Sequence, residues 1–205
     1  PVEGMTRTEA ADAEVTDSAA AGTAMASGYK TNKRSLGIDA EGNTRESIAE
    51  FAKAKGYKIG ILSTATLNHA TPAAFYAHVE DRGMYDEISK YMAQSGFDFF
   101  GGNRLSSNKG SDPAYSLLER HGYTVLTADS AGELKNLPIQ QPAYVYRKFG
   151  YAVEEKDKNK FMLADLTAKA ISVLDNPNGF FMMVEGALID WRAHTPRAAG
   201  PLAET

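Results

Sequence analysis

The sequence predicts an α/β fold, in which a central, mostly parallel sheet is flanked by helices. Short apolar runs alternate with segments of helical periodicity along the whole chain, a pattern typical of repeated βαβ units. The 205 residues, 43% of them hydrophobic, are enough to form one core. Because ligands bind beyond the carboxyl ends of parallel strands in such folds, functional residues are expected where strands end.

The first half of the chain begins this alternation. A helix is predicted to start at residues 43–46, and a buried strand follows at 57–62. Pro72 favours a further helix start, because proline fits the first helical position, where no N–H is needed. A helix at 85–94 then precedes a short strand at 97–100.

The second half continues in the same way. A helix is predicted from 112 to 121, and a strand follows at 123–127. Residues 143–146 fit a short strand and a loop segment equally well. Apolar residues recur at helical spacing from 161 to 174, and turn residues then break the chain before a strand at 180–184.

Composition excludes several classes of function. The net charge of −4 provides no basic field for nucleic acid, so no nucleic-acid binding is expected. The longest apolar run, Phe180 to Val184, is far shorter than the ~20 residues that cross a bilayer, so no membrane segment is expected. The absence of cysteine rules out disulfides and thiolate chemistry. The chain starts at Pro1 without a signal peptide, which indicates processing or truncation.

The first candidate cluster is Asp17-Ser18, followed by a run of very small residues that is expected to be helical. A hydroxyl at a helix N-terminus meets unpaired N–H groups and the positive end of the helix dipole, so Ser18 can bind phosphate or react with it. The alternative is that Ser18 only caps an alanine-rich helix. The cluster taken alone favours the cap.

The second cluster surrounds His69 and Thr71. The Thr71 hydroxyl suits a hard cation such as Mg²⁺, or it caps a helix. Arg82 is placed near the end of the helix that begins at Pro72, and its guanidinium matches two phosphate oxygens, although a solvated surface charge is the simpler role. His78 is expected to be a packed helix histidine.

The third cluster follows the last predicted strand. Glu185 closes a very apolar strand, where a carboxylate is costly unless a cation or a partner holds it. Asp190 and His194 are four residues apart, so a helix projects both from one face. This pair suits Zn²⁺ and Glu185 suits Mg²⁺. Metal binding is favoured here over a solvated Asp–His pair.

In this order, the three clusters resemble the alkaline phosphatase family. The resemblance rests on residues 17–23, residues 69–74 with Arg82, and residues 184–186 with Asp190 and His194. It extends over nearly the whole chain. It implies a central sheet flanked by helices and a site that holds two Zn²⁺ and one Mg²⁺.

The resemblance also implies roles for individual residues. Ser18 matches the nucleophile that becomes phosphorylated, Arg82 matches the phosphate-binding arginine, and Asp17 matches the residue that orients this arginine. His69 occupies a position where family members have Asp or His, which leaves the identity of the third metal open. The expected metal ligands are Thr71 and Glu185 for magnesium, Asp190 and His194 for one zinc, Ser18 for the other zinc, and His69 for the third metal.

The activity implied is hydrolysis of phosphate monoesters, with inorganic phosphate as product. A periplasmic or secreted location is expected from the resemblance, which also allows a homodimer. Two alternatives stay open: a related metal-dependent phosphodiesterase or sulfatase, and a non-catalytic structural or binding fragment. Arg82 together with a serine nucleophile favours the monoester.

Several family ligands have no counterpart in this chain. The family has a metal-bridging Asp well before the nucleophile, and an Asp-His pair and a further His well after the glutamate. Only 17 residues precede Ser18 and 11 follow His194, while His78 and His121 match none of these positions. We therefore expect residues 1–205 to be a partial catalytic domain from inside a longer enzyme, nearly inactive in isolation.

Overall fold

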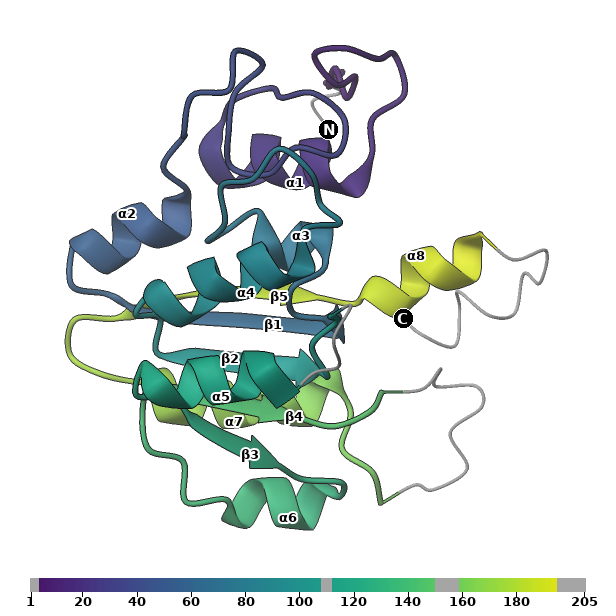
Figure 1. The fold of residues 1–205 in the computed structure, drawn as a ribbon. Coiled ribbons are helices and arrows are strands. Elements are labelled where there is room, and N and C mark those ends of the chain that lie inside the picture. Colours follow the sequence, from purple (N-terminus) through teal and green to yellow (C-terminus); the bar gives the residue numbers. More distant parts are fainter. Residues whose placement is uncertain (1–3, 108–111, 150–158, 195–205) are drawn as a thin grey trace.

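The computed structural model describes residues 4–107, 112–149 and 159–194 (Figure 1). Its sheet has five strands in the order β3-β4-β2-β1-β5, and each neighbouring pair is parallel. The sheet confirms the predicted α/β class. The strands are β1 (Lys58–Thr66), β2 (Phe99–Asn103), β3 (Thr124–Thr127), β4 (Ala143–Tyr146) and β5 (Phe180–Glu185).

Helices connect the strands and precede the first of them. The segment left open between strand and loop is β4, and the helix predicted at 85–94 has these bounds as α4. The helices are α1 (Ser18–Ser27), α2 (Ile48–Ala54), α3 (Ala70–Ala73), α4 (Tyr85–Gln94), α5 (Asp112–Arg120), α6 (Ala131–Asn136), α7 (Leu163–Leu174) and α8 (Ala187–Ala193).

The helices cover both faces of the sheet, as Figure 1 shows for α4 and α5 in front and α7 behind. On one face, Ile59 and Ile61 of β1 belong to a core that includes residues of α2, α4 and α5. On the other face, Leu62 of the same strand packs with α6 and α7. Because both faces are covered, β1 is buried along almost its whole length.

The helix predicted to begin at Pro72 and to reach Arg82 is wrong. Helix α3 ends at Ala73 after about one turn. The chain then forms an antiparallel bridge between Leu36 and Val79, each of which donates its N–H to the other's carbonyl over 2.9 Å. This pairing with a distant loop replaces helical hydrogen bonds, so Arg82 lies on a non-helical segment.

Other boundaries differ for local reasons. The helix expected at residues 43–46 begins at Ile48, because Ser47 and Glu50 form a reciprocal capping box. Strand β1 runs past residue 62 to Thr66, and α6 was not predicted at all.

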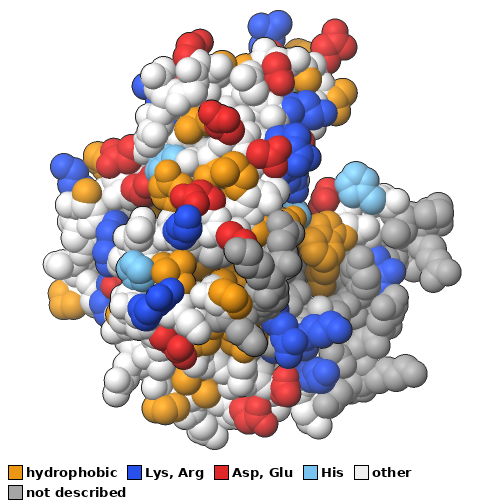
Figure 2. All heavy atoms as spheres, in the orientation of Figure 1, with side chains coloured by type: hydrophobic (Ala, Val, Ile, Leu, Met, Phe, Trp, Pro, Cys, Tyr) orange, Lys and Arg blue, Asp and Glu red, His pale blue; other side chains and the backbone are white. Residues whose placement is uncertain are grey.

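Within the described ranges, no helix is both long and apolar enough to cross a membrane. On the face drawn in Figure 2, acidic and basic side chains are interspersed.

Candidate active site

A pocket of about 190 Å³ lies where the start of α1, the segment after β1 and the β5–α8 junction meet. It therefore sits beyond the carboxyl ends of β1 and β5, where ligands of parallel sheets are expected. The pocket brings together most of the residues that the sequence singled out. It is lined by Ser18, Ala21, Met25, His69, Thr71, Glu185, Ala187, Asp190 and Trp191.

Asp17 fixes the position of Ser18 at the start of α1. It has an extended backbone, and its Oδ1 accepts a hydrogen bond from the N–H of Ala20 at 3.0 Å, which makes it the N-cap. Ser18 is then the first helical residue. Gly22 allows α1 to lie close to α3, since a Cβ at Gly22 would be 3.1 Å from Cβ of Ala74. The small residues after Ser18 thus bring α1 to the pocket.

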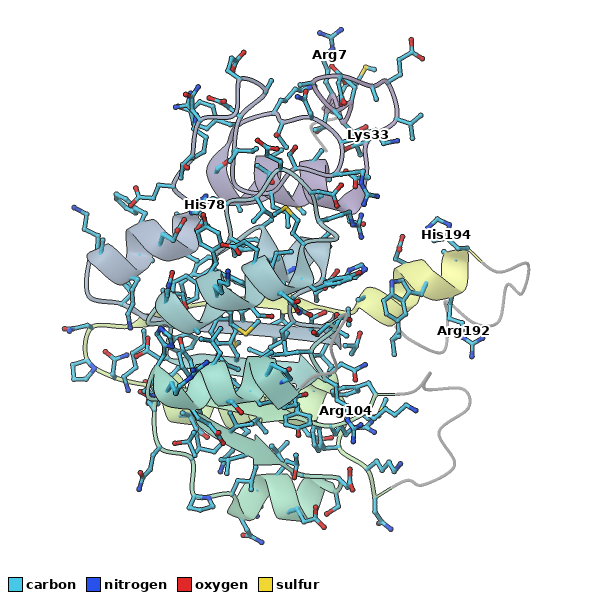
Figure 3. The ribbon with its side chains drawn as sticks, in the orientation of Figure 1. Arg7, Lys33, His78, Arg104, Arg192 and His194 are labelled. Carbon is cyan, nitrogen blue, oxygen red and sulfur yellow. The ribbon has the colours of Figure 1, made fainter. Side chains whose placement is uncertain are left out.

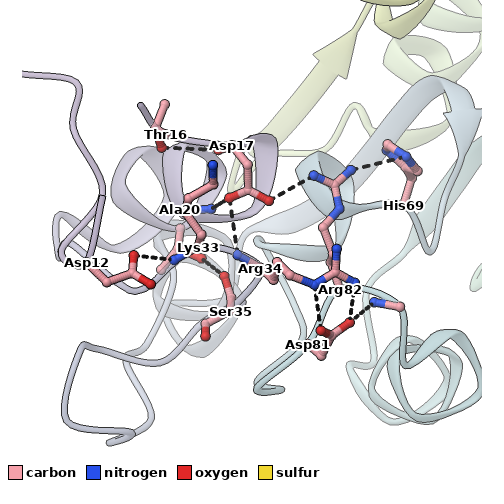
Figure 4. Close-up of polar contacts among 12 residues, drawn as sticks. Asp12, Thr16, Asp17, Ala20, Lys33, Arg34, Ser35, His69, Asp81 and Arg82 are labelled. Atoms are coloured by element: carbon pink, nitrogen blue, oxygen red, sulfur yellow. Dashed lines mark hydrogen bonds and ion pairs between the residues drawn. The ribbon is translucent and has the colours of Figure 1, made fainter. Parts of the chain in front are cut away.

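Arg82, on the segment after α3, does not line the pocket but lies beside it, in contact with the lining residue His69 (Figure 4). Its Nη1 donates to Oδ2 of Asp17 over 3.0 Å, and its Nη2 lies 3.3 Å from Nε2 of His69. Burial raises the pKa of Asp17, but hydrogen bonds from the Ala20 N–H and the Arg82 guanidinium outweigh it, so the pKa lies below its usual value. Asp17 is therefore an anion that holds the arginine.

Glu185 is a partly buried carboxylate of the site. It lies opposite Ser63 in the β1–β5 ladder, and the Ser63 hydroxyl donates to Oε2 of Glu185 over 2.5 Å. Burial raises the pKa of Glu185, against hydrogen bonds from Ser63 and Thr71 that lower it. A carboxyl in this environment is stabilised as an anion by a nearby cation. Sequence reasoning missed Ser63, because the strand was expected to end at residue 62 and the contact depends on the register of β1 and β5.

His69 is a neutral imidazole. Burial, helped by the positive charge of Arg82, lowers its pKa to about 4. Its ring makes an edge-to-face contact with Trp191, with ring centroids 5.7 Å apart. A neutral imidazole can accept a hydrogen bond or ligate a metal.

Asp190 and His194 project from one side of α8, as predicted, with His194 Nε2 3.6 Å from Oδ1 of Asp190. Asp190 lines the pocket, whereas His194 does not. The His194 side chain is 79% exposed and lies at the far end of α8 (Figure 3). The structure therefore does not bring His194 together with Glu185.

The described residues fit the expected metals unequally. Thr71 and Glu185 offer adjacent hydroxyl and carboxylate oxygens, the donor set that suits Mg²⁺. Within residues 4–107, 112–149 and 159–194, no group of three or more His, Cys, Asp or Glu side chains is placed to hold a metal ion. A catalytic zinc usually takes three protein ligands, and the pair predicted for it, Asp190 and His194, would offer only two.

The remaining histidines lie elsewhere. His78 packs outside the pocket, with its ring nitrogens 2.7 Å from the Gly37 carbonyl oxygen and 2.8 Å from Oε1 of Glu50. It is packed, as predicted, but not on a helix. His121 follows α5 and is exposed.

The fold and this pocket define an α/β protein whose polar site lies at the carboxyl edge of a parallel sheet. The sequence profile of the alkaline phosphatase family matches residues 1–108 and 146–205. The chain belongs to the alkaline phosphatase family, which confirms the resemblance found in the sequence.

Individual relatives support this assignment. Alkaline phosphatase 4 of Bacillus subtilis is 36% identical over 209 residues, which cover 98% of this chain and 45% of that protein. The crystal structure of a cold-active alkaline phosphatase from a psychrophilic Shewanella sp. superposes with a TM-score of 0.84 at 33% identity, covering 98% of this chain and 50% of that one. A single-residue mutant of TAB5 alkaline phosphatase with Mg bound in the M3 site gives 0.82 at 30% identity, covering 98% and 59%. The chain spans about half the length of the curated relatives it matches.

Proposed function

We propose that this chain forms the nucleophilic and phosphate-binding part of a phosphate monoesterase. The observation that carries the proposal is the Arg82–Asp17 ion pair, 3.0 Å long, next to Ser18 at the first position of α1. A guanidinium and the N-terminus of a helix both favour a dianionic phosphate, and Ser18 lines the adjoining pocket.

In the proposed reaction, Arg82 neutralises two oxygens of the phosphoryl group and aligns it with Ser18. The Ser18 hydroxyl loses its proton to solvent and its Oγ forms a bond to phosphorus while the bond to the ester oxygen breaks; the leaving oxygen takes up a proton from solvent and is released as an alcohol. Water then cleaves the phosphoserine and releases inorganic phosphate. Zinc and magnesium, when bound, supply charge stabilisation and a lowered pKa of the attacking hydroxyl.

The proposed metal positions follow the residues available. Thr71 and Glu185 would hold Mg²⁺, with His69 beside the same position, and Asp190 with His194 would hold one zinc. The second zinc would meet Ser18. The curated relatives are longer than the part matched here, so we propose that further zinc ligands come from the rest of the enzyme, of which residues 1–205 form a partial catalytic domain.

The location and oligomeric state of the enzyme are also inferred from the family. A periplasmic or secreted location and a homodimer accord with the family resemblance. A metal-dependent phosphodiesterase or sulfatase is the competing activity, and a non-catalytic fragment is the competing role.

Turnover separates these options. The protein expressed from its complete gene, loaded with zinc and magnesium, is assayed at alkaline pH with a chromogenic phosphate monoester, the matching diester and the matching sulfate ester. Its metal content is measured in parallel. Preference for the monoester supports the proposal. Preference for the diester or the sulfate ester assigns the competing activity, and no turnover with full metal content assigns the non-catalytic role.

A further inference from the structure

Arg34 occupies an unusual backbone position next to the candidate site. Its φ is 74°, and among the described residues no other non-glycine residue has a positive φ. This left-handed region favours glycine, because a Cβ crowds the backbone there. A long side chain in such a position is maintained by the surrounding contacts, so its contacts are informative.

The backbone of Arg34 contacts both members of the phosphate-binding pair. Its N–H donates to Oδ1 of Asp17 at 3.3 Å, and its carbonyl oxygen accepts from the N–H of Arg82 at 2.7 Å. Since Arg82 Nη1 in turn donates to Asp17 Oδ2, the three residues form a closed ring of hydrogen bonds, and Figure 4 shows the two contacts of Asp17 in this ring. The left-handed turn at Arg34 therefore sets the distance between the N-cap of α1 and the arginine.

The side chain of Arg34 adds a second constraint. Its Nε donates to Oδ2 of Asp81 at 2.7 Å and its Nη2 to Oδ1 at 2.9 Å, a bidentate pair with the residue directly before Arg82. Oδ1 of Asp81 also accepts from the N–H of Gly83 at 2.7 Å. The Asp81 carboxylate thus links the Arg34 guanidinium to Gly83, so the residues directly before and after Arg82 are both held.

We propose that Arg34 is a positioning residue for phosphate binding, which holds Arg82 in register with Asp17 and Ser18. This inference rests on the proposed function, because it takes Arg82 as the phosphate ligand. Arg34 acts through Arg82. A guanidinium that is already oriented before phosphate arrives loses less freedom on binding, so the constraint increases affinity.

Because the Arg34–Asp81 pair is exposed, its loss should affect the position of Arg82 without affecting the stability of the fold. The two side chains are 58% and 42% exposed, and ion pairs with such exposure contribute little to folding. The same segments are also joined by the Leu36–Val79 bridge and by a hydrogen bond from the Ser35 hydroxyl to the Glu80 carbonyl. The fold therefore does not depend on the Arg34 side chain.

Arg34→Gly is the decisive variant, because glycine accepts the left-handed backbone and removes only the side chain. The protein from the complete gene, loaded with zinc and magnesium, is titrated with inorganic phosphate by calorimetry. We expect about three- to tenfold weaker binding, which lies within the range for residues that act through a network of contacts rather than on the ligand itself. We also expect KM for a phosphate monoester to rise more than kcat falls, with an unchanged or higher unfolding temperature. Arg34→Lys keeps the charge without the bidentate geometry, so its phosphate affinity should lie between those of the wild type and Arg34→Gly.

Two further variants complete the test. Lys90→Ala is the matched control, because it removes a distant ion pair with Glu87 of nearly the same exposure, 55% and 41%, and it should leave phosphate affinity unchanged. Arg82→Ala tests the proposed function itself. If Arg82→Ala weakens phosphate binding and Arg34→Gly does not, or if Arg34→Gly acts only by lowering stability, the positioning role is refuted. If Arg82→Ala has no effect, the proposed phosphate site fails, and the positioning role with it.

Discussion

Nε2 of His78 lies 2.8 Å from Oε1 of Glu50, while Nδ1 of the same ring lies 2.7 Å from the carbonyl oxygen of Gly37. The histidine thus joins α2 to the loop before it. Burial lowers the pKa of His78, but the hydrogen bonds with Glu50 and Gly37 outweigh it, so the pKa is raised. Burial raises the pKa of Glu50, yet the contact with His78 and the Ser47 N–H leave it lowered.

This pair predicts how stability depends on pH. The contribution of His78 is complete below its unfolded pKa of about 6.5 and is lost as pH rises through its raised folded pKa. The contribution of Glu50 is present above about pH 4.3 and is lost as pH falls through its lowered folded pKa. We expect the free energy of unfolding, measured with urea, to fall as pH rises above about 6.5, and Glu50→Gln to reduce that fall.

A fall in the free energy of unfolding above about pH 6.5 can be assigned to His78 and Glu50, because His69 acts in the opposite direction and a control variant is available. The folded pKa of His69 is lowered to about 4, so its contribution increases with pH and is complete above its unfolded pKa of about 6.5. Glu87→Gln alters an exposed ion pair and should leave the dependence unchanged. An equal fall in the wild type and Glu50→Gln would show that the His78–Glu50 contact does not stabilise the fold.

Ser18→Ala should abolish the phosphoenzyme while the fold persists. Alanine is a good residue for the first turn of α1, and the Asp17 cap remains. The zinc- and magnesium-loaded protein from the complete gene is incubated with labelled inorganic phosphate and quenched in acid, and bound label is counted. Ser27→Ala, at the other end of α1, is the control and should retain the label. Label on Ser18→Ala at the wild-type level would contradict the assignment of the nucleophile.

Arg82→Ala should weaken binding of inorganic phosphate much more than it disturbs folding. A charge-assisted bidentate contact contributes about 1.5–3 kcal/mol, which corresponds to a loss of affinity of roughly ten- to hundredfold. Inhibition of monoester hydrolysis by phosphate measures this loss. Arg120→Ala, at the exposed end of α5, serves as control. An unchanged inhibition constant would mean that Arg82 only pairs with Asp17.

The isolated 205-residue chain should bind zinc poorly and hydrolyse phosphate esters at a negligible rate. The proposed zinc pair, Asp190 and His194, would offer only two ligands, and a serine hydroxyl alone does not hold Zn²⁺. Thr71 and Glu185 should still bind Mg²⁺ weakly, because this ion keeps several waters, and Glu185→Gln should weaken that binding further. Elemental analysis after dialysis, with a turnover assay at alkaline pH, tests both points. Two tightly held zinc ions per chain with ordinary turnover would overturn the expectation.

Gly102→Ala should destabilise the protein and distort the site. A Cβ at Gly102 would lie 2.2 Å from the carbonyl oxygen of Ser63, so β2 must move away from β1. Forcing extra volume into a packed core costs about 1–3 kcal/mol. Gly132→Ala, in α6, where a Cβ would meet only the Ser130 hydroxyl at an ordinary contact distance of 3.9 Å, should instead stabilise by roughly 0.5–1 kcal/mol. Urea unfolding of both variants tests whether this close approach of the strands matters.

Local signals in the sequence were sufficient for the elements that depend on them. Alternating apolar runs gave the parallel sheet, and the 85–94 periodicity matched α4 because that helix buries one face against the core. The helix at Pro72 failed because Leu36 and Val79, 43 residues apart, pair with each other. No local pattern records such a contact.

In the site too, local sequence signals identified some residues, whereas contacts between distant parts of the chain could not be predicted. Polar residues at predicted helix starts pointed to Ser18 and Thr71, and the end of a strand pointed to Glu185; the pocket contains all three. The Ser63 contact with Glu185 depends on the register of two strands, and the role of Arg34 depends on a backbone angle, so neither could be found from residue types. The exposure of His194 likewise depends on where α8 points.

The pairing of β1 with β5 has a consequence for the order of events on the ribosome. Ser63 leaves the ribosome 122 residues before Glu185, a delay of roughly 6–24 s at usual rates of synthesis. β1 can pair with β2 soon after both emerge, but its other edge stays open until β5 arrives. An open apolar strand edge attracts other strands. During this interval, a chaperone bound to the nascent chain would protect the open edge of β1 from pairing with other strands until β5 is synthesised and the pocket can form.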